Sequence, residues 1–259
     1  MNYVLINSEV ANEICTINFN REEGYNVLTE QVRAELFDAL QVANRDPQVR
    51  GVILTGGKKI FCGGADIKFM ARATAADMYC QPENTRRIVE YMESMVKPVI
   101  AVLSGYTLGG GCELSLGCDI RIASETVQIG LPEIRLGIIP GGGGVQRLVR
   151  LVGVSRARDL IYSGRILKAS EALDIGLVDE VVPVDQLLEA AVKRMKSYTR
   201  HGAVAVAAAK TAINTGIALS PRDADVLEKM CFAMLFSTED QKEGMQAFID
   251  KRKPAFKGK

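Results

Sequence analysis

The chain has 259 residues, of which 47% are hydrophobic, so it can bury the core of one large domain or of one domain with an appendage. Its 32 lysines and arginines nearly balance its 31 aspartates and glutamates, which leaves no overall basic field to hold a nucleic acid or an anionic membrane. An anionic ligand would therefore need a local binding site.

The cysteines and the apolar runs indicate in which cellular compartment the protein is expected. The six cysteines are scattered, form no CxxC pair and lie mostly within apolar runs, which is typical of small buried thiols under reducing conditions. The start, Met1 to Ile6, leads directly into strand-like sequence and lacks the basic and apolar segments of a secretory signal. Gly, Glu or Asp interrupts every apolar run before membrane-spanning length. We expect a cytoplasmic protein that contacts neither membrane nor nucleic acid.

Short apolar strands alternate with helical periods in the first two thirds of the chain. The predicted strands cover residues 14–19, 52–54, 99–102 and 119–123. The first predicted helix shows apolar residues at helical spacing, namely Val32, Leu36, Leu40 and Ala43. Thr29 precedes this helix as a predicted N-cap, and further helices are expected over residues 88–95 and after Gly111. The alternation predicts an α/β fold with crossover connections.

From about Val184 onward the strands stop and helices follow. The predicted helices cover residues 186–198, 204–214, 222–236 and 239–251. Their apolar stripes exceed what a lone helix needs, and one such stripe comprises Val226, Met230, Ala233 and Met234. We therefore expect these helices to associate with other copies of the chain.

The clearest candidate for a catalytic motif is the stretch from Gly105 to Ile120, GYTLGGGCELSLGCDI. Three glycines follow a strand that ends near Leu103 and begin an amphipathic run. Glycines let another group approach the backbone, and the free N–H groups of a helix's first turn can stabilise a developing negative oxygen. By itself such a run more often forms a tight strand-to-helix packing turn. Nucleotide binding is not indicated, because neither GxGxxG nor a P-loop lysine occurs in context.

Two glutamates lie near these glycines. Glu113 falls one turn into the helix that the glycines begin, and Glu133 lies in the mostly apolar segment LPEIRLGIIPGGGG. A second glycine cluster, FCGGADIK at Phe61 to Lys68, follows the strand over residues 52–54 and supplies further amides. Carboxylates that are buried or paired differ in proton affinity, so one can donate a proton while the other accepts one. This chemistry adds water across a double bond, although each glutamate taken alone is more often a solvated charge.

Several segments resemble motifs of the crotonase (enoyl-CoA hydratase) family, in the expected order and over nearly the whole chain. These segments are FCGGADIK, KPVIAVLSGYTLGGGCELSLGCDIRIAS, LPEIRLGIIPGGGGVQRL, SGRILKASEALDIGLVDEVV and STEDQKEGMQAFIDKRKPAF. The resemblance implies a core of residues 1–195, built as an α/β spiral of ββα units that holds the active site. It also implies that residues 196–259 are a helical region that forms homotrimers, which pair into hexamers.

The resemblance also assigns roles to single residues. The amides of Ala65 and Gly110 would form an oxyanion hole for a thioester oxygen, and Glu113 and Glu133 would position a water and shuttle its proton. The backbone of Gly141 would help to orient this pair. The coenzyme A site would be lined by Ala65, Asp66, Ile67 and Lys68. The implied reaction is the reversible syn hydration of a short-chain trans-2-enoyl-CoA, such as crotonyl-CoA, with no metal and no cofactor apart from the coenzyme A of the substrate.

The sequence departs from the family pattern at two places. Leu131 stands where the family often has Gln, and Arg21-Glu22 stands where it often has Arg-Pro. These departures leave the acyl preference open. Residues that fall where the family shapes its acyl pocket are Phe69, Met70, Met78 and Tyr79, although apolar residues at such spacing are more often ordinary core.

Other functions fit the sequence less well. A sibling activity of the family (enoyl-CoA isomerase, dienoyl-CoA hydratase or acyl-CoA decarboxylase) stays open, as does a binding protein that keeps the fold without catalysis. A Ser/His/Asp hydrolase would need His201, the single histidine, which lies outside every glycine motif. The basic residues near the C-terminus are Lys251, Arg252, Lys253, Lys257 and Lys259. Such clusters are usually solvated faces, although in this family they can approach the phosphates of coenzyme A across a subunit boundary.

Overall fold

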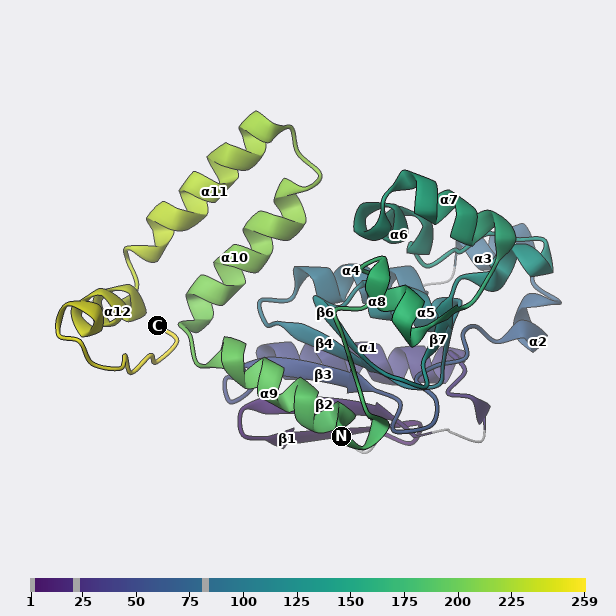
Figure 1. Ribbon diagram of the computed structural model, residues 1–259, viewed down its shortest axis with the longest axis horizontal. Coiled ribbons are helices and arrows are strands. Elements are labelled where there is room, and N and C mark those ends of the chain that lie inside the picture. The colour runs from purple at the N-terminus through teal and green to yellow at the C-terminus, as the bar shows by residue number, and fades with distance from the viewer. Residues whose placement is uncertain (1–2, 21–23, 81–83) are drawn as a thin grey trace.

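A six-stranded sheet forms the centre of the protein. The computed structural model describes residues 3–20, 24–80 and 84–259. In it the strands of this sheet lie in the order β1-β2-β3-β4-β6-β9. They are β1 (Ile6–Ala11), β2 (Ile14–Phe19), β3 (Gly51–Thr55), β4 (Val99–Leu103), β6 (Ile120–Ser124) and β9 (Glu180–Val182). Strands β1 and β2 are antiparallel and all other neighbours are parallel (Figure 1). The predicted α/β class is confirmed, and each predicted strand lies in this sheet.

Two layers of helices cover the sheet. Along each strand successive side chains point to opposite faces. On one face, strand residues such as Ile53, Ile100 and Ile122 pack against α9 (Leu187–Thr199). On the other face, residues such as Leu54 and Leu103 pack against α1 (Glu30–Arg45) and α4 (Thr85–Ser94). Strands that are buried on both faces read as continuous apolar runs, which is why they could be predicted.

The start of helix α1 agrees with the sequence-based expectation. Thr29 is its N-cap, and the Oγ1 atom of this residue accepts a hydrogen bond from the amide of Val32 at 3.3 Å. The apolar residues Leu36, Leu40 and Ala43 are buried, so the predicted helical face is the core face. Helix α1 is thereby fixed beside the groove described below.

A second, three-stranded sheet has the order β5-β7-β8 and was not predicted. Its strands are β5 (Tyr106–Leu108), β7 (Gln128–Gly130) and β8 (Leu167–Lys168). The sequence also gave no sign of the hairpin between β1 and β2, whose turn places Asn12 and Glu13 at positive φ. Such turns usually carry Gly at one of these positions, and this one does not.

Short helices connect the strands and carry the glycine motifs. They are α2 (Ile67–Met70), α3 (Ala75–Tyr79), α5 (Gly110–Leu116), η2 (Pro132–Leu136), α6 (Gly144–Val152), α7 (Val154–Ser163), α8 (Ala169–Asp174) and η3 (Val184–Gln186). The helix that was expected after Gly111 begins within the GGG motif, at Gly110. Within the described ranges, no helix has both the length and the apolarity that a membrane crossing requires.

The last helices form an arm that extends from the body. This C-terminal arm comprises α10 (Ala203–Gly216), α11 (Pro221–Leu235) and α12 (Glu239–Ile249) (Figure 1). Together with α9 these are the four helices that the sequence predicted. Helix α10 packs on α4 and α11 packs on α10. The predicted division between residues 195 and 196 falls in the last turns of α9, the helix that covers the sheet.

Candidate active site

One large groove brings together most of the predicted site residues. It has a volume of about 1730 Å³ and is bordered by α1, the loop after β3, the start of α5 and the glycine run before α6. The predicted residues that line it are Ala65, Asp66, Ile67, Gly110, Glu113, Glu133 and Gly141. Lys68 is exposed and is not among the lining residues within the described part of the chain.

The two amides predicted as an oxyanion hole belong to adjacent segments. The bond from Leu108 N to Cys62 O, 3.0 Å long, ties the strand before α5 to the loop after β3. A Cβ placed on Gly110 would lie 3.6 Å from the amide nitrogen of Ala65, so the two backbones nearly touch. Gly110 is the first residue of α5, where an N–H group has no partner within its own helix. Both amides therefore belong to the groove wall, where a single substrate oxygen could accept a hydrogen bond from each of them.

Glycine is required beside this pair of amides. Gly64 has φ +107°, and a Cβ there would lie 2.8 Å from the carbonyl oxygen of Leu108. Gly109, the N-cap of α5, has φ +52° and lies directly beneath the Glu133 carboxylate, because a Cβ there would be 3.1 Å from Oε1 of Glu133. Side chains at these positions would strain the backbone or fill the space between the amides and the carboxylate.

Glu113 is a buried carboxylate held by backbone amides. Its residue is 4% exposed, and its Oε1 accepts hydrogen bonds from Gly142 N at 2.7 Å and from Gly144 N at 2.9 Å. Burial raises the pKa of Glu113, whereas the amides of Gly144 and Gly142, and then the charges of Arg147 and Arg86, act to lower it. Hydrogen bonds to a carboxylate favour its charged form. The site therefore contains a desolvated carboxylate whose ionised state is supported by two donors.

Glu133 is a carboxyl group in a different environment. It lies in the first turn of η2, and its Oε2 is buried with no hydrogen-bond partner among the described residues. Burial raises the pKa of Glu133 to about 7; the bond to its own backbone amide opposes this, and the charge of Glu113 adds to it. A carboxyl with such a pKa exists in both protonation states near neutral pH. The two glutamates thus differ in the way that acid and base partners require.

We expect Glu133→Gln to raise the free energy of unfolding by about 2 to 3 kcal/mol at pH 8, and by little at pH 4.5. The pKa of Glu133 rises from 4.5 to about 7 on folding, so the cost of burying its charge is absent below pH 4.5 and complete above pH 7. Urea unfolding of both proteins at the two pH values measures the difference. The control is Glu125→Gln, an exposed glutamate. Equal stabilisation at both pH values would contradict the assigned burial cost.

Some of the other residues singled out in the sequence line the groove, and others lie elsewhere. Of the residues proposed for the acyl pocket, Phe69, Met70 and Met78 line the groove, whereas Tyr79 is 90% exposed and is not among its lining residues. Leu131 is 2% exposed, and its Cδ1 would be 3.1 Å from a Cβ on Gly144. The Arg21-Glu22 departure lies outside the described residues. His201, which a hydrolase would need, follows α9 and is not among the groove's lining residues.

The amides that hold Glu113 were not identified from the sequence. The prediction gave the orienting role to Gly141, which lines the groove, whereas Glu113 accepts its hydrogen bonds from Gly142 and Gly144. The run of four glycines was visible, but a run contains several possible donors. Apolar residues of the groove that were also missed are Leu136, Ile138 and Ile139, and only their neighbourhood to Glu133 in the chain could have suggested them.

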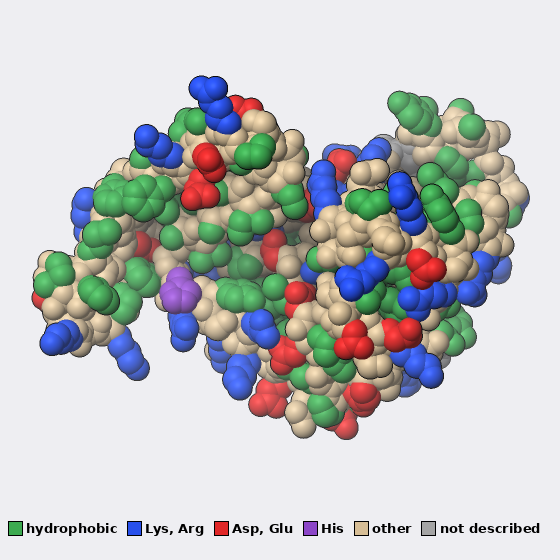
Figure 2. Space-filling model, turned by 45° about the horizontal axis from the view of Figure 1, so that its top comes forward, with side chains coloured by type: hydrophobic (Ala, Val, Ile, Leu, Met, Phe, Trp, Pro, Cys, Tyr) green, Lys and Arg blue, Asp and Glu red, His purple; other side chains and the backbone are tan. Residues whose placement is uncertain are grey.

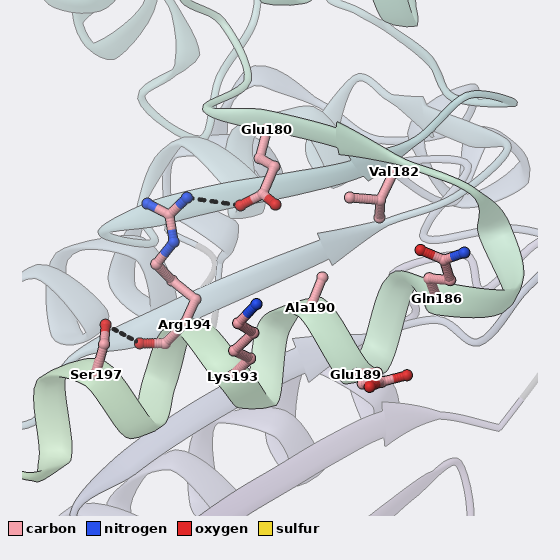
Figure 3. Close-up of a pocket in the computed structure, with 8 residues that line it drawn as sticks. All are labelled: Glu180, Val182, Gln186, Glu189, Ala190, Lys193, Arg194 and Ser197. Carbon is pink, nitrogen blue, oxygen red and sulfur yellow. Dashed lines mark hydrogen bonds and ion pairs between the residues drawn. The ribbon is translucent and has the colours of Figure 1, made fainter.

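A second hollow, of about 430 Å³, lies between β9 and α9 (Figure 3). In it Arg194 of α9 pairs with Glu180 of β9 at 2.6 Å. Lys193 and Glu189 add one charge of each sign. Among the described residues, none lines both this hollow and the large groove. Its charges are mixed and mutually paired in part, so it provides no focused binding site for an anion or a cation.

Comparison with known proteins agrees with the geometry. A family model described as Enoyl-CoA hydratase/isomerase matches residues 9–259. The chain is 40% identical over 257 residues to a crotonyl-CoA hydratase from Syntrophomonas wolfei, covering 99% of both chains. It is also 40% identical over 254 residues to a short-chain-enoyl-CoA hydratase from Clostridium acetobutylicum, covering 98% of this chain and 97% of that protein.

Among solved structures, an enoyl-CoA hydratase from Bacillus anthracis superimposes with a TM-score of 0.94 at 42% identity, covering 99% of this chain and all of the other. An enoyl-CoA hydratase subunit from Geobacillus kaustophilus superimposes with a TM-score of 0.95 at 34% identity, covering 99% of each chain. The sequence match and the fold therefore agree over the whole length. The chain belongs to the enoyl-CoA hydratase/isomerase family and has the crotonase fold.

Proposed function

We propose that the chain catalyses the reversible hydration of a trans-2-enoyl-CoA to a 3-hydroxyacyl-CoA. One observation carries this proposal: the buried Glu113 and the partly buried Glu133, which differ in proton affinity, share a groove with two amides from adjacent segments. Relatives named crotonyl-CoA hydratase and short-chain-enoyl-CoA hydratase support this choice of reaction and of a short acyl chain.

In the proposed mechanism the amides of Ala65 and Gly110 bind the thioester oxygen. When water adds at C3, negative charge gathers on this oxygen as an enolate. Backbone donors that already point at the site stabilise this charge without reorganising. This part of the proposal is supported by the close approach of the two backbones and by the position of Gly110 at the start of α5.

The two glutamates handle the protons of the added water. Glu113, whose Oε1 is engaged by two amides, is the ionised partner and accepts a proton from water as it attacks C3. Glu133, with a pKa of about 7, is the partner that carries a proton and delivers it to C2. The proton then returns from Glu113 to Glu133 through solvent or product, so no net charge is consumed. Dehydration follows the same steps in reverse.

The groove is lined by residues that suit both ends of the substrate. Ala65, Asp66 and Ile67 line it on the side of the predicted coenzyme A site, and Lys68 follows them in α2. Its apolar lining includes Met70, Met78, Leu136, Ile138 and Ile139. Such side chains suit an acyl chain. The proposed reaction uses no metal and no cofactor other than the coenzyme A of the substrate.

The test is an assay of the wild-type protein with crotonyl-CoA. We expect loss of the conjugated thioester absorbance and a product heavier by one water, identified by mass spectrometry. A panel of longer, branched and cyclic 2-enoyl-CoAs determines the acyl preference. A protein that leaves every 2-enoyl-CoA unchanged but shifts the double bond of a 3-enoyl-CoA would be an isomerase, and the proposal would be wrong.

We also propose that the chain assembles into a homotrimer or a pair of trimers through its C-terminal arm. Hydrophobic side chains gather over this arm (Figure 2). The exposed ones include Val226, Met230, Phe232, Met234, Phe236 and Phe248. Large apolar patches of this kind mark interaction surfaces in soluble proteins. These apolar side chains are exposed while α10 is packed against α4, so another copy could bind them without separating the two helices.

The proposed location is the cytoplasm. Four of the free cysteines, Cys15, Cys62, Cys112 and Cys118, are buried. Burial raises the pKa of the Cys62 thiol to about 12, so this thiol stays protonated and unreactive. Buried unpaired thiols are typical of proteins kept in a reducing compartment.

A further inference from the structure

The orientation of Glu113 depends on a segment of unusual backbone freedom. Its two donors, Gly142 N and Gly144 N, flank Gly143, which has φ +99°. A Cβ on Gly142 would lie 2.6 Å from Oε2 of Glu113, so the segment packs directly on the carboxylate. Glycine loses more conformational freedom on folding than any other residue. Contacts from outside the run must therefore keep the two amides directed at one oxygen.

Arg147 makes such a contact from the first turn of α6. Its backbone amide donates to Gly143 O at 3.3 Å, and its Nη1 donates to the same oxygen at 3.4 Å. The guanidinium lies so close to Gly143 that a Cβ there would collide with it. One side chain thus fixes the middle residue of the run, and the donors to Glu113 lie on either side of it.

Glu93, in the last turn of α4, holds this guanidinium with both carboxylate oxygens. Arg147 Nε donates to Glu93 Oε1 at 2.7 Å, and Nη2 donates to Oε2. The side chains are only 13% and 32% exposed, so water screens the pair weakly. A bidentate pair between a guanidinium and a carboxylate defines an orientation as well as a distance.

The end of α4 is itself attached to the C-terminal arm. Asn214 of α10 donates from Nδ2 to Glu93 O at 2.9 Å. Lys210 of α10 donates from Nζ to Met92 O at 2.8 Å and pairs with Asp119 Oδ2 at 2.9 Å. These donors satisfy carbonyl groups that the last turn of a helix leaves free. A continuous series of contacts therefore runs from α10 to the carboxylate of Glu113.

We propose that Glu93 and Arg147 are positioning residues for the reaction, which hold the glycine run so that Gly142 and Gly144 present their amides to Glu113. Neither residue touches the reacting atoms in this scheme. The proposal rests on the proposed function, because it assumes that Glu113 acts in turnover. It makes the geometry of the catalytic carboxylate depend on an ion pair between α4 and α6.

Two consequences separate this role from a purely structural one. Loss of the ion pair should lower kcat and leave KM nearly unchanged, because the substrate contacts of the groove persist. The charged groups that act on Glu113 are Arg147, Arg86 and Glu133, with the thiol of Cys112 beside it. Removing the charge of Arg147 takes away a cation that favours ionised Glu113. The acidic limb of the pH profile should then move to higher pH.

The test compares Arg147→Met, Arg147→Lys and Glu93→Gln with the wild type. We expect kcat for crotonyl-CoA to fall about 10- to 100-fold in Arg147→Met and Glu93→Gln, as a small displacement of a catalytic group does. Arg147→Lys keeps the charge and loses the bidentate geometry, so its kcat should be reduced while its acidic limb stays in place. The limb should move to higher pH in Arg147→Met alone.

The controls are Arg194→Met and Glu180→Gln, which break another Arg–Glu ion pair, in the hollow between β9 and α9 (Figure 3). The glutamates of the two pairs are similarly exposed, whereas Arg194 is more exposed than Arg147. We expect wild-type kcat and pH profile in both controls. Unchanged kcat in folded Arg147→Met and Glu93→Gln would overturn the proposal, as would equal losses in the controls. Thermal melting curves establish that each variant is folded.

A readout without turnover keeps this test separate from the proposed function. Infrared difference spectra against Glu113→Gln report the titration of the Glu113 carboxyl directly. If the wild type hydrates no enoyl-CoA, the proposed function fails on its own. An unchanged Glu113 titration in Arg147→Met would then still count against the positioning role, and a titration moved to higher pH would support it.

Discussion

Glu113→Gln should lower kcat for crotonyl-CoA hydration about 1,000-fold and change KM by less than about threefold. Gln keeps an oxygen at the position of Oε1, so the amides of Gly142 and Gly144 retain their acceptor. The variant should therefore fold and bind substrate normally. It lacks only the group that accepts the proton of water. Steady-state kinetics with the absorbance assay measure both constants.

Two further variants sharpen this prediction. Glu125→Gln changes an exposed glutamate between β6 and β7 and should leave both constants unchanged. The double variant of Glu113 and Glu133 should lose little more than the worse single variant, because groups that act as a unit are not additive. Retention of more than a tenth of wild-type kcat in folded Glu113→Gln would refute the role of Glu113 as the base.

Gly110→Pro should lower kcat about 100- to 1,000-fold, because it deletes one of the two amides proposed to bind the thioester oxygen. Gly110 is the first residue of α5, a position at which proline fits the helix and no intrahelical bond is lost. The change therefore removes the donor without breaking the helix. Kinetics with crotonyl-CoA measure the loss, and thermal melting establishes the fold.

Gly110→Ala is the matched control for this change. Its methyl group would lie 3.0 Å from Cδ1 of Leu28, a contact that the Leu28 side chain must give way to slightly. Because the alanine variant keeps the amide, its kcat should exceed that of the proline variant by at least tenfold. Equal loss in the two variants would show that steric crowding, and not the missing donor, causes the defect.

The strands of the main sheet could be predicted because their burial is visible in the sequence. β3 and β4 are buried at every position, so they read as apolar runs, and α1 shows its core face through Leu36 and Leu40. β8 has only two residues, too few for any periodicity to show. The hairpin turn at Asn12 and Glu13 was equally hard to predict, because Asn tolerates the left-handed conformation but Glu rarely adopts it, and no Gly marks the turn.

The candidate site was predicted in its residue types and not in its contacts. The sequence placed Glu113 one turn after the glycines of α5, and local helical geometry suffices for that. It could not choose between Gly141, Gly142 and Gly144 as donors, because the path of four consecutive glycines is decided by what packs on them. It gave no sign of Glu93 and Arg147, which lie 54 positions apart and meet only when α4 packs beside α6.

The sequence by itself determined the α/β rhythm, the helical C-terminal region and the resemblance to the crotonase family. These features reside in local periodicity and in contiguous motifs, which need no partner from elsewhere in the chain. Only the tertiary structure decided how Glu113 and Glu133 differ. Burial raises the pKa of both carboxyls, and the amide donors that oppose this at Glu113 come from a segment about 30 residues away in the chain. Proton affinity depends on surroundings, and surroundings exist only after folding.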